Sequence, residues 1–145
     1  MNTRKTILAA TLLLGAATAA FAAAQDPDVR ARQEVMGLIG SNLKKIAPMA
    51  QGKADFDAAV AQAAFAKIAE KAAMVPGVFE TRSNTDPEAE AKDALWDNWD
   101  DFVSKAAALQ NAAEAGANVD SLEALQAAFG PLAGTCKSCH TAYKE

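Results

Sequence analysis

The chain has 145 residues, of which 51% are hydrophobic, and its formal net charge at pH 7 is −4. This length suits one domain with enough chain to bury a hydrophobic core. The acidic balance argues against nucleic acid as a partner, because binding to phosphates depends on clustered Lys and Arg side chains.

The amino terminus has the pattern of a secretory signal peptide. Two basic residues precede an apolar run over residues 7–20, and small residues and then polar ones follow it. The run is short and rich in alanine, so we expect residues 1–24 to be removed rather than retained as a membrane anchor. Cleavage after Ala24 fits the pattern, and cleavage after Ala22 is the alternative. The mature domain, residues 25–145, is then exported to the periplasm without an anchor.

The first half of the mature domain predicts two helices. Asp26–Pro27 forms a helix start, and core-type positions then recur at steps of three and four as far as Ile46. A second helix is expected from near Asp55 until the dipeptide Pro76–Gly77 stops it. The polar stretch from there to Pro87 predicts the one long connection of the domain.

The second half predicts two more helices. The tripeptide Asp86–Pro87–Glu88 repeats the Asp–Pro start, and apolar residues at steps of three and four predict one long helix that ends near Gly116. The last helix is expected to begin in a variant capping box, with Asp120 as N-cap and Glu123 three residues later, and to run to His140. These four amphipathic helices predict an all-α fold, an antiparallel up-down four-helix bundle, whose core can hold a cofactor.

The strongest chemical signal is the run Cys136-Lys137-Ser138-Cys139-His140. These are the only two cysteines of the chain, and a disulfide between them would close too small a loop to add much stability. C-x-x-C-H is the attachment sequence for c-type haem. On a helix its first, fourth and fifth residues share one face, so Cys136 and Cys139 can form thioethers to the haem vinyl groups while His140 binds the iron.

Other uses of this motif fit the sequence less well. A structural zinc site needs about four protein ligands, and the chain has two cysteines and one histidine in total. Thioredoxin-like chemistry needs a βαβ context, which the helical pattern lacks. A bundle that holds no haem and serves as an interaction module is the remaining alternative.

The sixth coordination position of the haem iron needs a ligand other than a histidine of this chain, or stays empty. Because His140 is the only histidine, two histidines of one chain cannot bind the iron together. Of Met36, Met49 and Met74, only Met36 lies on the seam of a clear amphipathic helix, one turn after Arg32. An arginine on the buried side needs an anion, and a haem propionate would supply one. Alternatively, Met36 is core packing and Arg32 reaches solvent.

The chain resembles the class II cytochromes c, the family that contains cytochrome c prime and its low-spin relatives. The resemblance covers the whole mature domain, and its most specific element is the haem motif within Gly134–Lys144, at the carboxyl terminus. Class I cytochromes place this motif near the start. Weaker matches are Arg32-Gln33-x-x-Met36, Asp57-Ala58-Ala59 and Ala94-Leu95-Trp96.

The resemblance implies roles for individual residues and one covalent haem c per chain. The two cysteines attach the haem, His140 is the proximal iron ligand, and Met36 faces the distal side of the iron. Arg32 would meet a haem propionate, and Lys144 would flank the proximal side. The resemblance leaves homodimerisation through the first two helices open.

The family contains two functions that differ at the distal residue. In cytochrome c prime proper the iron is five-coordinate and high-spin and admits NO or CO, whereas in the low-spin branch a methionine binds the iron and the protein carries electrons. The run Met36-Gly37-Leu38-Ile39-Gly40 resembles the low-spin branch, where a small residue follows the methionine by one turn. We therefore expect a periplasmic electron carrier with His140 and Met36 as axial ligands and an unidentified redox partner. It is not expected to be an enzyme, and gas binding is the alternative.

Overall fold

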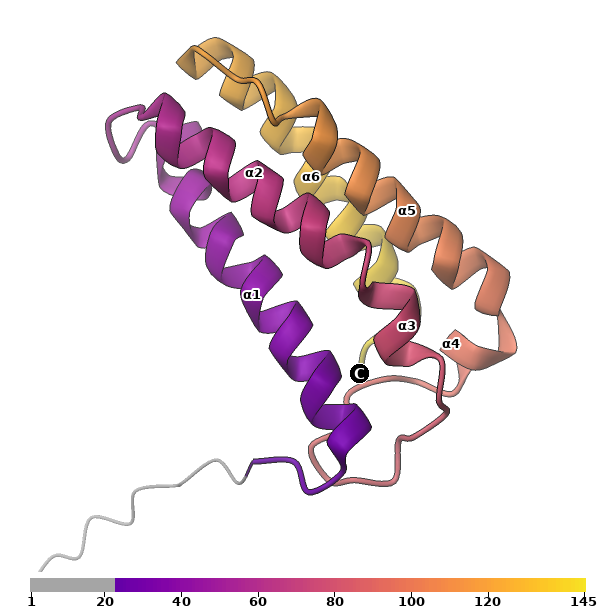
Figure 1. Cartoon of the computed structure of the whole chain (residues 1–145). Helices are drawn as coiled ribbons and strands as arrows, with labels where there is room; N and C mark the ends of the chain where they lie inside the picture. Colours follow the sequence, from indigo (N-terminus) through magenta and orange to yellow (C-terminus); the bar gives the residue numbers. More distant parts are fainter. Residues whose placement is uncertain (1–22) are drawn as a thin grey trace, which may run out of the picture.

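The computed structural model describes residues 23–145, and four long helices of this part form an up-down bundle (Figure 1). The helices are α1 (Pro27–Ala50), α2 (Ala58–Ala72), α3 (Val75–Phe79), α4 (Ala94–Asp97), α5 (Trp99–Ala115) and α6 (Leu122–Tyr143). Helices α1, α2, α5 and α6 are the long ones, which confirms the expected fold class. None of the helices in residues 23–145 is long and apolar enough to cross a membrane. The expected signal peptide lies almost wholly outside the described residues.

Short-range capping explains where three of the long helices begin. The Asp26 side chain accepts hydrogen bonds from the backbone N–H groups of Asp28 and Val29, and Pro27 opens α1, as expected. Asp57, rather than Asp55, caps α2. The expectation that Asp120 caps the last helix was wrong by one residue. Ser121 has the extended backbone that an N-cap needs, and its hydroxyl accepts from the Ala124 N–H at 3.2 Å.

The expectation of one long third helix from Asp86 was wrong. The Asp86 carboxylate accepts from the backbone N–H groups of Gln25 and Asp26 at 2.7 and 2.8 Å, and from that of Glu88 at 2.8 Å. Asp86 therefore ties the connection to the start of α1 instead of opening a helix. Helix formation begins only at Ala94 and is interrupted at Asn98, between α4 and α5.

The residues before this connection also differ from the expectation. Pro76 and Gly77 do not end a helix, since they lie inside the short helix α3, where Pro76 takes a first-turn position that needs no backbone N–H bond. The connection therefore runs over residues 80–93. It passes round the end of the bundle at which α1 begins and α6 ends (Figure 1).

The core lies between the four long helices. Helix α2 packs between α1 and α5, and α6 packs mainly on α5. The largest fully buried side chains come from all parts of the bundle: Phe65, Phe102, Ile46, Ile68, Leu95, Leu125 and Leu132. The close packing of α2 on the end of α5 depends on Gly116, because a Cβ atom at this position would overlap the ring of Phe65.

Replacing Gly116 by alanine should therefore destabilise the fold. Overpacking of this kind costs about 1–3 kcal/mol in the free energy of unfolding, which denaturant titration followed by circular dichroism will measure. The matched control is Gly37→Ala, since a Cβ atom at Gly37 in α1 meets nothing within 4 Å. This control should be neutral or stabilising by up to about 1 kcal/mol. Equal stability of the two variants would contradict the packing argument.

Candidate functional site

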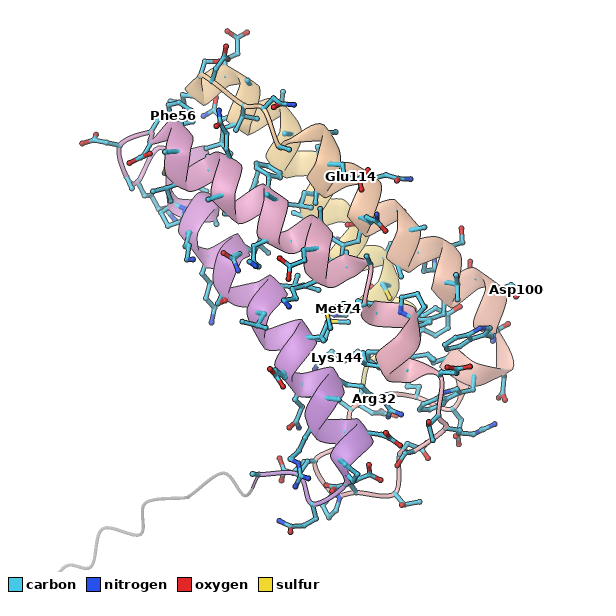
Figure 2. All side chains as sticks on the ribbon, in the orientation of Figure 1. Arg32, Phe56, Met74, Asp100, Glu114 and Lys144 are labelled. Atoms are coloured by element: carbon cyan, nitrogen blue, oxygen red, sulfur yellow. The ribbon has the colours of Figure 1, made fainter. Side chains whose placement is uncertain are left out.

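A cleft opens at the end of the bundle where α1 begins and α6 ends. It encloses about 690 Å³ of space, part of it open to solvent. Its walls come from the first half of α1, the end of α6, Phe79, α5 and residues 88–91 of the connection. Five of the six residues predicted for the haem site line it: Arg32, Met36, Cys139, His140 and Lys144. Figure 2 shows Arg32 and Lys144 at this same end of the bundle.

The sixth predicted residue, Cys136, lies one helical turn before Cys139. Helix α6 is continuous through the whole motif, so Cys136, Cys139 and His140 share one face of it. Both cysteines are partly buried against the core and neither forms a disulfide. Burial raises the pKa of both thiols, and the charge of Lys105 counteracts this in part at Cys139.

His140 lies on the cleft side of the last turn of α6. Partial burial lowers the pKa of its imidazole, and the neighbouring charge of Lys144 lowers it further, against a smaller opposite effect of Glu90. These effects favour the neutral imidazole, which is the form that can bind a metal ion.

Met36 reaches the cleft from the other wall. It is partly buried on α1, beside the buried stripe that contains Val35 and Ile39, and it packs against the core without belonging to it. The thioether lines the same cleft as the imidazole of His140.

The residues present suit a haem. The two thiols and the neutral imidazole lie on one face of α6, and the cleft beside them has apolar walls that include Val29, Leu95 and Phe102. Such walls suit an apolar macrocycle better than a hydrated ion. Within residues 23–145, no three His, Cys, Asp or Glu side chains gather in a way that could hold a metal ion without a cofactor.

Arg32 is buried at the rim of the cleft, as its place on the core face of α1 predicts, but its contacts were not foreseen. Its exposed fraction is 5%. The guanidinium donates to the backbone carbonyls of Val78, Thr81 and Ser83, which lie in or just after α3. It also lies 5.1 Å from the ring centres of both Phe79 and Trp96. Its role toward a propionate stays a prediction.

The carboxyl terminus and the connection 80–93 are joined beside His140. Ala91 and Lys144 form an antiparallel bridge, and backbone N–H groups of Lys92 and Glu145 donate across it at 2.9 Å each. The Lys144 ammonium lies 2.6 Å from the Glu90 carboxylate. Sequence reasoning missed this wall of the cleft, because residues 88–91 carry neither a periodic pattern nor a motif.

Tyr143 holds the end of α6 against α5 through buried contacts. Its side chain is 7% exposed and packs edge-on against Phe102, with ring centres 5.8 Å apart. Its hydroxyl donates to the carboxylate of Asp101 on α5. This hydrogen bond, together with burial, raises the pKa of Tyr143 to about 12.

The fold and the cleft define a class of protein, a c-type cytochrome with one haem in a four-helix bundle. The model of the cytochrome C' family matches residues 28–144. The chain belongs to this family, whose members carry covalent haem c, and haem c is therefore its cofactor.

Individual relatives agree with this assignment. The chain is 32% identical to a cytochrome c' of Rhodopseudomonas palustris over 147 residues, which cover 99% of this chain and 97% of that protein. It is 37% identical to a cytochrome c-556 of Agrobacterium tumefaciens over 118 residues, which cover 79% of this chain and 91% of that one. A solved structure of the Rhodopseudomonas palustris cytochrome c' matches with a TM-score of 0.73 at 29% identity, over 83% of this chain and 98% of the other.

The bond between Tyr143 and Asp101 predicts an unusual titration. Tyr143 is the only tyrosine of the chain, so its phenol can be followed alone by NMR of ¹³C-labelled tyrosine. The folded protein keeps the phenolic proton up to a pKa of about 12, whereas the unfolded chain loses it at about 10. The stability that this bond contributes is thus complete below about pH 10 and is lost as the pH rises towards 12.

The variant Asp101→Asn should move the midpoint of this titration down towards 10. Lys105→Gln is the matched control, since Lys105 lies near Asp101 but does not contact the phenol, and it should leave the midpoint close to 12. A midpoint that does not move in Asp101→Asn would contradict the role given to this hydrogen bond.

Proposed function

We propose that this protein is a single-haem electron carrier of the periplasm, with His140 and Met36 as the axial ligands of the iron. The observation that carries the proposal is that the imidazole on α6 and the thioether on α1 line the same cleft from different walls. Cys136 and Cys139 attach the haem from the α6 side. No other methionine lines this cleft among the described residues.

The residues around the cleft support electron transfer in separate ways. A haem held there supplies one-electron chemistry at its iron. The neutral imidazole of His140 is ready to bind without first losing a proton. A thioether in the sixth position and apolar walls both favour the reduced, less charged iron, which raises the reduction potential. A carrier of this kind turns over no substrate, so we propose no enzymatic activity.

Export to the periplasm belongs to the same proposal. Covalent attachment uses two free thiols, and the segment 1–24 has the pattern of a signal that takes the chain to the compartment where c-type haem is attached. Cleavage after Ala24 would leave Gln25 as the first residue. The proposed partners are a periplasmic electron donor and a periplasmic electron acceptor.

Gas binding is the second candidate. It is favoured by the cytochrome c' name of a relative that matches over almost its whole length. In that case Met36 screens an open sixth position that admits NO or CO, and the iron is five-coordinate and high-spin.

Met36→Ala separates the two functions. If Met36 binds the iron, the wild-type ferric protein will be low-spin with the weak red band of methionine-bound haem, and the variant will become high-spin and bind CO readily. Met74→Ala is the control, because Met74 is 43% exposed and lies outside the cleft. A wild-type spectrum that is already high-spin, and that Met36→Ala leaves unchanged, would favour the gas-binding function.

The attachment residues are tested by Cys136→Ala, Cys139→Ala and the double variant. Each single variant should keep one thioether, and the double variant should keep none, so that its haem separates from the chain on a denaturing gel. Haem staining of the gel and the mass of the intact protein will measure this. Ser138→Ala, between the two cysteines, is the control. Covalent haem on the double variant would contradict the assignment.

A further inference from the structure

The buried guanidinium of Arg32 is held by backbone rather than by acidic side chains. In the part of the chain that the structure describes, no carboxylate forms an ion pair with it. Its partners are the three carbonyls of Val78, Thr81 and Ser83. A fully charged group is costly to bury unless its donors are paired. The hydrogen bonds to these three carbonyls offset the cost of burying the guanidinium.

These three carbonyls lie where the chain leaves α3 and enters the connection 80–93. Phe79 lies between Val78 and Thr81 in the sequence. Its side chain lines the cleft, and the face of its ring contacts the guanidinium. Trp96 covers the guanidinium with its own ring, and its indole N–H donates to the Phe79 carbonyl at 2.8 Å. Arg32 thus joins α1, the end of α3 and α4 at one point.

The rest of the connection is attached by more exposed groups. Beyond Ser83 it is held at three further places: Asp86 binds the start of α1, the Gln33 amide on α1 donates to the Glu88 carbonyl at 3.1 Å, and Ala91 forms the bridge to the carboxyl terminus. Residues 88–91 between these places line the cleft. These three other attachments use exposed or partly exposed groups, whereas that of Arg32 is buried.

We propose that Arg32 is a positioning residue that holds the connection 80–93 against α1, and so sets how far the wall of the haem cleft is closed. It acts through the backbone of this segment, and this action needs no contact with a propionate. The proposal rests on the haem lying in this cleft, but not on Met36 binding the iron.

The test compares Arg32→Gln and Arg32→Lys with wild type, in the haem-loaded protein. Hydrogen exchange is measured at the amides of Glu88, Ala89 and Lys92. The first two donate to Asp86 within the connection, and the third donates to the Tyr143 carbonyl. Arg32→Gln loses the charge and most donors, so these amides should exchange at least about tenfold faster, while amides in the middle of α5 keep their rates. Arg32→Lys should be intermediate, since it keeps the charge but cannot reach three carbonyls.

The reduction potential supplies a readout that a purely structural role would not move. Opening the wall exposes the haem to water, which favours the ferric state, so the potential should fall in Arg32→Gln and fall less in Arg32→Lys. Trp96→Phe removes the N–H donor to Phe79 without removing any charge, and it should cause smaller changes of both kinds. Arg30→Gln, an exposed arginine two residues earlier on α1, is the control and should change neither.

Two results would overturn the proposal. If the potential falls in Arg32→Gln while exchange in the connection is unchanged, Arg32 acts directly on the haem. If exchange is unchanged and the potential is unchanged as well, Arg32 does not hold the wall. Should Arg32→Gln fail to fold, Arg32→Lys and Trp96→Phe give the same two readouts. Hydrogen exchange does not depend on which ligand the iron has, and the potential of each variant is compared with that of wild type, so a failure here is distinct from a failure of the proposed axial ligation.

Discussion

In the proposed site, covalent attachment through two cysteines on one helix face ties the haem to the last turns of α6, and every other contact with the cofactor must come from elements that pack near this end. Helix α1 provides the opposite wall with Met36, and the connection 80–93 closes the side. The distance between α1 and α6 at this end therefore decides whether a thioether can reach the iron. That distance depends on the packing of α2 and α5 and on the contacts of the connection, rather than on the haem motif itself.

The bundle could be predicted because its determinants are local. Asp26–Pro27 is a cap whose partners are two and three residues away, and apolar steps of three and four need only neighbours on the same helix. Asp86–Pro87–Glu88 has the same local pattern and gave the wrong expectation. The backbone groups that Asp86 binds belong to Gln25 and Asp26, about sixty residues earlier in the chain, and no local pattern contains such a contact.

Part of the haem site could also be predicted from local patterns, and part of it could not. The face shared by the motif residues follows from helix geometry, and the place of Met36 and Arg32 on the core side of α1 follows from their spacing. The partners of Arg32 could not be predicted, because backbone carbonyls have no sequence signature and any residues at 78–83 could supply them. The ion pair of Glu90 with Lys144 was equally hidden, since it forms only when the connection reaches the carboxyl terminus.

The bridge between Ala91 and Lys144 has a practical consequence for work on this protein. The backbone N–H of Glu145, five residues after the proposed iron ligand His140, is bonded to the Glu90 carbonyl. An affinity tag fused after Glu145 would disturb this pairing, and a tag before residue 1 would be lost if the expected signal peptide is removed. A purification handle is better inserted in the exposed turn at residues 51–55, at the far end of the bundle.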